Sequence, residues 1–292
     1  MKTITKAVVP AAGFGTRFLP QTKAFPKEML PVVDKPVIQY VVEEIVASGI
    51  KDIVLVTGSL KRAIEDHFDV PNADLIKNLQ ASGKEDLIQA MKKISEMANF
   101  IYIRQKGAYG NGTPVLSAEP VVKGEPFAVL WGDEFIHSDP PRLLQMMKVH
   151  EKYGGAVISG IRIKKREDLK RYGIAKVQPV GENVFKIEHI VEKPELDEAP
   201  SDLATHGAYI LPPEIFDILR NQQPGKGEEI WLSVAIDELI KTGYPVYACE
   251  IENARYFDTG NKLEYLKTVV QLALEHPEIN GDFRDFLKEL DL

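Results

Sequence analysis

The sequence predicts an α/β fold in which helices flank a mixed, mostly parallel sheet. Short apolar runs, typical of buried strands, alternate with amphipathic segments of helical period through the first half of the chain. The second half keeps the strands but separates them by turns as well as by helices. At 292 residues the chain can bury a full core, and no internal repeat divides it. We therefore expect one domain over residues 1–292.

The clearest unit is a strand, a loop, a helix and a second strand over residues 7–58. Residues 7–9 form an apolar run that predicts a buried strand. Apolar residues then recur in pairs four apart over 37–46, which predicts an amphipathic helix that ends near Gly49. A second apolar run at 52–58 completes a βαβ unit. Ligands of open α/β sheets bind at the carboxyl ends of the strands, so a site is expected in the loop after residue 9.

The remaining elements follow from the same patterns. Residues 60–98 are charged and helical with breaks near Pro71 and Gly83, which predicts a short helix and a helical hairpin. Further strands are expected at 100–104, 126–130, 155–163, 172–177, 184–191, 208–211 and 246–251, and further helices at 110–122, 140–153, 229–241, 263–274 and 283–290. We expect a turn at Pro179-Val180-Gly181 and an outer position for the last strand. The last two helices are expected outside the core or in a subunit contact.

Composition limits the classes of function. The chain is 44% hydrophobic and 27% charged, as in ordinary globular proteins, and no run approaches the roughly 20 apolar residues of a membrane span. A net charge of -7 argues against a nucleic-acid-binding protein, which usually has a basic surface. The single cysteine, Cys249, cannot form an internal disulfide and is expected in the core. We therefore expect a cytoplasmic protein with no nucleic-acid or membrane partner.

The loop after the first strand has the composition of a phosphate-binding loop. Small residues let backbone N–H groups approach a ligand closely, and glycine can supply a positive φ. The candidate positions are Ala11, Ala12, Gly13, Gly15 and Thr16. Three cations follow, Arg17, Lys23 and Lys27, and two prolines between them stiffen the segment. A stiff loop that carries three cations suits a polyphosphate.

Two common phosphate motifs do not fit this stretch. It has no Gly-x-x-x-x-Gly-Lys-Ser/Thr, which excludes a P-loop, and Gly15 is not followed by the third glycine of the dinucleotide fingerprint. Asp34 lies near the distance expected of a ribose-binding acid, but it does not end a second strand. A Rossmann oxidoreductase is therefore a weak alternative, which NAD(P)H binding would test.

The segment resembles the signature of the sugar-nucleotide pyrophosphorylases. The residues that carry the resemblance read Gly13-x-Gly15-Thr16-Arg17-x-x-Pro20-x-Thr22-Lys23-x-x-Pro26-Lys27-Glu28-Met29-Leu30-Pro31. The resemblance extends over nearly the whole chain and implies a Rossmann-like fold of the nucleotide-diphospho-sugar transferase type. It implies a nucleotide-binding half at 1–153, a sugar-phosphate-binding half at 154–260 and C-terminal helices at 261–292. Lys27-Glu28 favours uridylyl transfer, since the related thymidylyltransferases typically have Lys-Gln here.

The resemblance also implies a reaction. A sugar 1-phosphate attacks the α-phosphorus of a nucleoside triphosphate directly and pyrophosphate leaves, with UTP and α-D-glucose 1-phosphate as substrates and UDP-glucose as product. Arg17 and Lys27 are then catalytic, because the phosphate charge must be neutralised as the bond forms, and Lys23 binds the nucleotide. Gln105 and Gly110 are expected at the uracil, since a carboxamide presents a donor and an acceptor together. Thr113-Pro114 stands where the family has His-Ala, which leaves the choice between uracil and thymine open.

Two carboxylates are the candidate Mg²⁺ ligands. Asp133 follows an apolar strand and Asp258 lies in a glycine turn, and Mg²⁺ takes one or two carboxylates together with phosphate oxygens. Each aspartate alone could equally cap a helix or form a turn, but together they match the metal pair of the family. Glu134, next to Asp133, is expected to face solvent or to support the site from behind.

The sugar phosphate is expected in the second half of the chain. By resemblance, Glu192 accepts the sugar hydroxyls and Lys193 holds the phosphate, while Gly173 and Gly207 leave room for the pyranose. The Glu-Ile-Gln-Leu-Thr-Asp of the family becomes Glu229-Ile230-Trp231-Leu232-Ser233-Val234 in this chain. The loss of two polar side chains there leaves the preferred sugar open.

Several functions therefore remain open. They are a thymidylyltransferase, a uridylyltransferase for another sugar 1-phosphate, and a non-catalytic regulator that binds a sugar nucleotide. The presence of Lys27, Asp133 and Asp258 argues against the regulator. We also expect a homo-oligomer, either a dimer or a tetramer.

Overall fold

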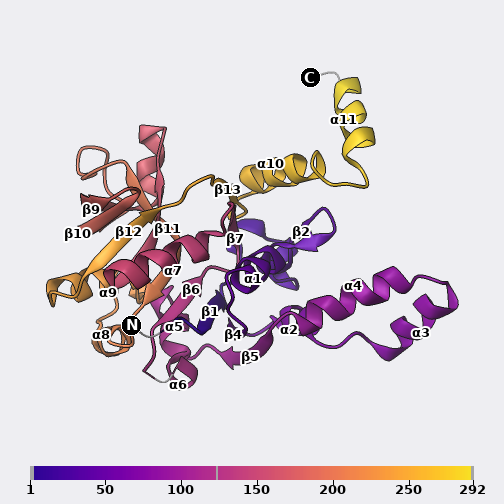
Figure 1. The fold of residues 1–292 in the computed structure, drawn as a ribbon, viewed down its shortest axis with the longest axis horizontal. Helices are drawn as coiled ribbons and strands as arrows, with labels where there is room; N and C mark the ends of the chain where they lie inside the picture. The colour runs from indigo at the N-terminus through magenta and orange to yellow at the C-terminus, as the bar shows by residue number, and fades with distance from the viewer. Residues whose placement is uncertain (1–2, 123, 291–292) are drawn as a thin grey trace.

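The computed structural model describes residues 3–122 and 124–290, so the expected domain ends at residues 1 and 292 lie outside this range. At its centre is a nine-stranded mixed sheet with the order β5-β4-β1-β6-β11-β8-β12-β10-β9 (Figure 1). The first four strands in this order are parallel: β5 (Asn99–Arg104), β4 (Asp52–Thr57), β1 (Lys6–Ala11) and β6 (Phe127–Leu130). The predicted α/β fold with a mixed sheet is confirmed.

The second half of the sheet is largely antiparallel. It contains β11 (Leu203–Leu211), β8 (Ala156–Arg162), β12 (Val246–Glu250), β10 (Val184–Glu192) and β9 (Gly173–Gly181). β8 and β12 run parallel, whereas β11 is antiparallel to β6 and β8, and β10 is antiparallel to β12 and β9. β11 joins the two halves into one sheet, because it pairs with β6 on one side and with β8 on the other. The sheet is thus mixed but not mostly parallel as expected, because antiparallel pairings are at least as frequent as parallel ones among the described strands.

Two expectations about the second half are wrong. β12 is not an outer strand, because it lies between β8 and β10. The chain does not turn at Pro179-Val180-Gly181 either: β9 continues to Gly181, and the turn falls at Glu182 and Asn183, where Asn183 has a φ of 54°. Pro179 is compatible with β9 because β11 pairs with this strand only at Gly173 and Ile174, so at Pro179 the strand has a neighbour, β10, on one side alone.

Helices cover both faces of the sheet. Successive side chains of β1 pack alternately into two apolar clusters, Ala7 and Val9 into one and Val8 into the other, as the period of a strand requires. The first cluster contains side chains of α1 (Val37–Ala47) and α7 (Arg142–Tyr153). The second contains side chains of α5 (Gly112–Ser117), α6 (Glu119–Val122), α8 (Ile215–Asn221) and α9 (Leu232–Lys241). Cys249 is buried in the first cluster, as expected.

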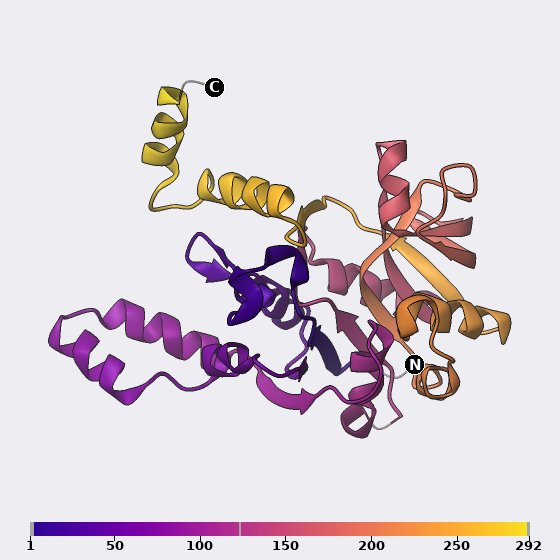
Figure 2. The same cartoon turned by 180° about the vertical axis from the view of Figure 1, so that it is seen from behind.

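Two helical arms project from this body (Figures 1 and 2). The first is the hairpin of α3 (Ala73–Ala81) and α4 (Glu85–Glu96), which follows the short helix α2 (Arg62–Phe68) as predicted. α2 itself packs Ile64 and Phe68 into the first cluster. The second is α10 (Lys262–Ala273) and α11 (Asn280–Glu289), and α11 contains no buried residue within its described length. Among the helices of residues 3–122 and 124–290, none is long and apolar enough to cross a membrane.

Short elements shape the carboxyl edge of the first half of the sheet. β7 (Glu134–His137) pairs with β13 (Arg255–Asp258), which sets Asp258 opposite Glu134. β2 (Pro31–Val32) pairs with β3 (Lys35–Pro36). The 3₁₀ turns are η1 (Thr16–Phe18), η2 (Gln21–Lys23), η3 (Lys27–Met29), η4 (Arg166–Arg171) and η5 (Lys226–Glu228). Segments from both ends of the chain therefore meet at this edge.

Candidate active site

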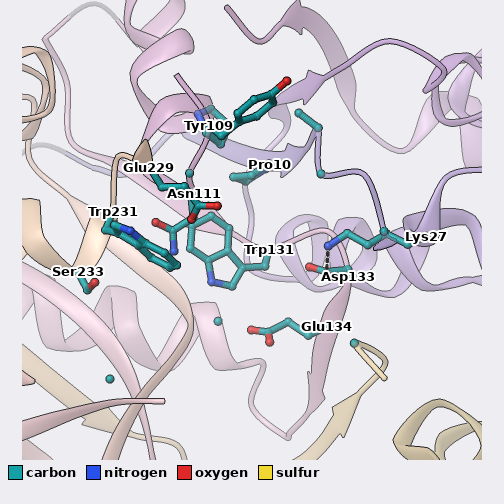
Figure 3. Close-up of a pocket in the computed structure, with 18 of the residues that line it drawn as sticks. Pro10, Lys27, Tyr109, Asn111, Trp131, Asp133, Glu134, Glu229, Trp231 and Ser233 are labelled. Carbon is teal, nitrogen blue, oxygen red and sulfur yellow. Dashed lines mark hydrogen bonds and ion pairs between the residues drawn. The ribbon is translucent and has the colours of Figure 1, made fainter. Parts of the chain in front are cut away.

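A cleft of about 1390 Å³ lies at the carboxyl ends of β1, β5 and β6. Its walls come from both halves of the chain: the glycine loop and Gln105 from the first half, and Gly173, Glu192 and Gly207 from the second. Figure 3 shows Lys27 and Asp133 pointing toward one another on one side, with Trp231 and Ser233 on the other. The loop after β1 therefore lies at a cleft, where a ligand site was expected.

The glycine loop packs against the turn that carries Lys27. Gly15 has a φ of 66°, and a Cβ on it would lie 3.0 Å from Thr22 Cγ2 and 3.2 Å from Lys27 Cβ. The Thr22 hydroxyl donates a hydrogen bond of 2.7 Å to the carbonyl of Gly15. A Cβ on Gly13 would lie 3.4 Å from Lys27 Nζ. Glycine is required at Gly15 for both its φ and its space, and the loop backbone stays open beside the Lys27 ammonium.

The other predicted loop residues differ in their positions. Ala12, Thr16 and Arg17 line the cleft, and Arg17 Nη1 donates a hydrogen bond of 3.1 Å to the carbonyl of Gly260. Ala11 is the last residue of β1 and is buried in the core. Lys23 is exposed and does not line the cleft. The structure thus brings Arg17 and Lys27 to the cleft but leaves Lys23 at the surface of the loop.

Lys27 and Asp133 form an ion pair in the cleft. Their side chains are 25% and 26% exposed, and Lys27 Nζ donates to Asp133 Oδ2. Burial alone would lower the pKa of the Lys27 ammonium, but Asp133 and Glu28 beside it raise the pKa above its ordinary value. Burial would raise the pKa of the Asp133 carboxyl, but Lys27 holds it below its ordinary value. Both groups are therefore charged at neutral pH.

A second, more deeply buried pair lies behind Lys27. Lys61 Nζ donates a hydrogen bond of 2.7 Å to Glu28 Oε2, and the two residues are 5% and 1% exposed. Burial raises the pKa of Glu28, although Lys27 and Lys61 oppose the shift. Glu28 belongs to the glycine-loop motif. Lys61 belongs to no motif, so the sequence did not predict a role for Lys61.

Asp258 reaches the same part of the cleft from the other end of the sequence. The Thr259 hydroxyl donates to the main-chain carbonyl of Asp133, which ties the two segments together. Arg171 Nη2 donates to Asp258 Oδ2 at 2.8 Å, and the Gly260 N–H donates to Asp258 Oδ1 at 2.7 Å. Both predicted metal ligands therefore line one cleft, each held by a cation of the protein. Arg171 is a further cleft residue that sequence reasoning missed.

Glu134 is not a solvent-facing residue. Its side chain is 17% exposed, lines the cleft and accepts a hydrogen bond of 3.3 Å from the Tyr256 hydroxyl. Burial and the nearby Asp133 raise the pKa of Glu134 to about 8. Glu134 turns inward because β7 begins at it and pairs with β13. A Cβ on Gly207, whose φ is 67°, would overlap Glu134 Oε1, so Gly207 makes room for this carboxyl as well as for a ligand.

Buried polar groups surround Glu134. Among the described residues, Glu134 Oε1, Arg142 Nη1 and His206 Nδ1 are buried and form no regular hydrogen bond, although His206 Nδ1 lies 3.3 Å from Glu134 Oε1. Arg142 is fully buried and makes two hydrogen bonds to Glu44, of 3.0 and 2.9 Å. Burial and Arg142 lower the pKa of His206 to about 3, so this imidazole is neutral. The floor of the cleft is therefore polar and rigidly built.

The expected base-binding segment crosses the start of α9. The Ile230 N–H donates to the Tyr109 carbonyl at 2.8 Å, and the Gly112 N–H donates to the Ile230 carbonyl at 2.9 Å. Gly110, with a φ of 115°, lies at this crossing, and a Cβ there would overlap the Ile230 backbone. Gln105 and Gly110 both line the cleft. Gly110 is thus required by the crossing of two chain segments, which the sequence did not indicate.

The expected sugar-phosphate residues also line the cleft. A Cβ on Gly173 would lie 2.9 Å from Thr205 Oγ1 and 3.1 Å from Glu192 Oε2, so a larger residue there would displace these two side-chain ends. Lys193 has a φ of 48°, and its Nζ lies 3.9 Å from Glu192 Oε1. All four predicted residues, Gly173, Glu192, Lys193 and Gly207, therefore meet at the end of the cleft formed by the second half.

The fold and the cleft are those of an α/β protein that places a glycine loop and several cations at the carboxyl edge of its sheet. The sequence matches the nucleotidyl transferase family over residues 6–274, and the chain belongs to this family. It is 46% identical over 292 residues to a UTP–glucose-1-phosphate uridylyltransferase of Staphylococcus epidermidis, with all of both chains covered. The resemblance seen in the glycine-loop motif is thus confirmed for the full chain.

Solved structures agree with this relationship. A UTP-bound UGPase from Acinetobacter baumannii is similar with a TM-score of 0.91 and 38% identity, covering 99% of this chain and 100% of the other. A UDP-glucose pyrophosphorylase complexed with UDP-glucose is similar with a TM-score of 0.85 and 36% identity, covering 94% of this chain and 100% of the other. The protein is therefore a nucleotidyltransferase whose architecture is shared with enzymes of known structure.

Proposed function

We propose that the protein transfers the uridylyl group of UTP to α-D-glucose 1-phosphate, giving UDP-glucose and pyrophosphate. One observation carries the proposal: a single cleft holds the glycine loop with Lys27 and Asp133 at one end and Glu192 with Lys193 at the other. Two phosphorylated substrates can therefore meet between two sets of cations. The similarity to uridylyltransferases and to a UTP-bound UGPase supports UTP as one of them.

The reaction needs no protein nucleophile. A phosphate oxygen of the sugar 1-phosphate attacks the α-phosphorus of UTP and forms the new P–O bond. The bond from the α-phosphorus to the oxygen that bridges to the β-phosphorus breaks, and pyrophosphate leaves with that electron pair. Catalysis then consists of positioning and charge stabilisation. Lys27 supplies a point charge at the glycine loop, and Arg17 supplies a fork that suits phosphate oxygens.

The residues at the cleft fit a magnesium ion. Asp133 and Asp258 are hard oxygen donors, both line the cleft, and each now accepts from a cation, Lys27 or Arg171. Within the described chain no group of three or more potential ligands is clustered, as suits an ion that takes the rest of its ligands from phosphates. We propose that Asp133 and Asp258 hold Mg²⁺, which would offset the charge of the triphosphate.

Substrate recognition divides between the two halves of the chain, 1–153 and 154–260. Gln105 would bind the base through its carboxamide. Gly110 has no side chain and would let the backbone approach the flat base. Glu192 would accept sugar hydroxyls, and Lys193 would hold the phosphate of the sugar. Thr113 and Pro114 are both buried, but only Pro114 also lines the cleft, so of the two residues that differ from the family it is the one nearer to a nucleotide.

A pyrophosphate-release assay over several nucleoside triphosphates and sugar 1-phosphates tests the proposal. We expect UTP with glucose 1-phosphate to give the highest kcat/KM. Highest activity with dTTP, or with another sugar, would replace this assignment by the corresponding transferase. Binding of UDP-glucose without pyrophosphate release from any pair would point to a non-catalytic regulator and contradict the proposal.

We further propose that the enzyme is a cytoplasmic homo-oligomer, a dimer or a tetramer. The C-terminal arm supports this, because α10 and α11 expose Leu263, Leu266 and Phe286 at 61%, 58% and 52%. Large apolar side chains gathered on one arm are typical of an interface. Light scattering should give a multiple of the chain mass, and replacing these three residues with serine should reduce it. A monomer at micromolar concentration would contradict the proposal.

A further inference from the structure

Trp231 and Val234, which replace a glutamine and an aspartate of the family motif, have different surroundings. Trp231 lines the cleft, whereas Val234 is 43% exposed on α9 and does not line it. Trp231 can therefore act on the substrates, and Val234 cannot touch them. The two replacements fall in one sequence motif, but the structure places them in different surroundings.

The backbone of Trp231 is fixed on both sides. Trp231 is the residue before α9, and its carbonyl accepts hydrogen bonds of 3.2 Å from the Ala235 N–H and from Gln222 Nε2. The next N–H, of Leu232, donates to Asn111 Oδ1 at 2.8 Å. The indole is thus presented to the cleft from a segment tied to its neighbours, with Asn111 beside it in Figure 3.

Lys193 reaches the indole from the residue directly after β10. The Lys193 N–H donates to the Tyr172 carbonyl at 3.0 Å, and its φ of 48° departs from that of a regular strand. Its Nζ lies 4.9 Å from the centre of the Trp231 ring, a distance at which a cation is attracted to the ring face. The Lys193 side chain is 51% exposed and has a flexible four-carbon stem, so it has few other restraints.

We propose that Trp231 is a positioning residue that seats the Lys193 ammonium for the sugar phosphate, which rests on the proposed function of this cleft. Lys193 Nζ is 3.9 Å from Glu192 Oε1, at the limit of an ion pair. The indole holds the ammonium by its ring face and so keeps it from closing onto Glu192. The Glu192 carboxylate then remains available to sugar hydroxyls, and the ammonium remains available to the phosphate.

Steady-state kinetics of Trp231→Leu test the proposal. An exposed cation–π contact corresponds to about a 3- to 5-fold change in an equilibrium constant. We expect the KM for glucose 1-phosphate to rise by about this factor, with the KM for UTP and kcat nearly unchanged. Trp231→Phe keeps a ring face and should recover part of the loss. Val234→Asp, in α9 three residues after Trp231 and outside the cleft, is the matched control and should leave all three constants unchanged.

A double-mutant cycle with Lys193→Met shows whether Trp231 acts through Lys193. We expect Trp231→Leu to have no further effect on the KM for glucose 1-phosphate once Lys193 is replaced. An equal effect in both backgrounds, or an unchanged KM in the single variant, would overturn the proposal. If Trp231→Leu does not fold, the same cycle with Trp231→Met, which also has no ring face, decides in the same way. Calorimetry measures the affinity of the same variants for UDP-glucose. The double-mutant cycle can therefore be evaluated from binding even if the wild type releases no pyrophosphate from UTP and glucose 1-phosphate.

Discussion

Replacing Lys27 by methionine should remove most of the catalytic rate. Lys27 Nζ lies beside Gly13 of the glycine loop and pairs with Asp133, so its charge is held in place before substrate binds. Methionine keeps the length and the apolar stem of the side chain but removes the ammonium. The variant therefore tests the charge of Lys27 with little change in packing.

The size of the effect follows from the setting of the ammonium. Its side chain is three-quarters buried, where an electrostatic contact is stronger than in water. The loss of one preorganised donor to a developing negative charge lowers kcat by about 10²- to 10³-fold, or roughly 2.7 to 4 kcal/mol. The variant also leaves Asp133 without its cation, which should lower the free energy of unfolding by about 1 to 3 kcal/mol. The protein should remain folded but become slow.

Pyrophosphate release with saturating UTP and glucose 1-phosphate measures this effect, and urea unfolding measures the stability. Lys23→Met is the matched control, because Lys23 is a cation of the same loop that is exposed and does not line the cleft. We expect its kcat to stay close to that of the wild type. A Lys27→Met enzyme with nearly normal kcat would refute the reasoning, and an equal loss in both variants would show that the loop acts through its overall charge.

Three further outcomes are expected. Gln105→Ala should raise the KM for UTP about tenfold with less effect on kcat, and should reduce discrimination against CTP; unchanged base selectivity would exclude Gln105 as the reader of the base. A chelator should abolish activity and Mg²⁺ should restore it. Asp133→Asn and Asp258→Asn should each lower kcat by roughly 10²-fold and raise the Mg²⁺ concentration needed for activity. Full activity of either variant at low Mg²⁺ would show that the replaced residue is not a metal ligand. Glu44→Gln should lower the free energy of unfolding in urea by about 3 to 5 kcal/mol, because it leaves the fully buried Arg142 without a counter-charge, and a loss below 1 kcal/mol would contradict this.

The elements that depend only on neighbouring residues in the chain could be predicted from the sequence. The strand, glycine loop, helix and strand of the first unit could be predicted because burial leaves a period in the apolar residues and a tight loop needs glycine. The helical hairpin after β4 could be predicted for the same reason. The family also followed from the sequence, because the glycine-loop motif is contiguous and long.

Tertiary structure alone decided which distant residues meet. Lys27 and Asp133 are 106 positions apart, and Arg171 and Asp258 are 87 apart, so no local pattern could pair them. The inner position of β12 and the inward turn of Glu134 depend on neighbouring strands in the same way. The spacing of apolar residues and the turn residues indicate which positions along the chain are buried. Which residues meet across the cleft depends on the order of the strands in the sheet, and the packing of the whole chain sets that order.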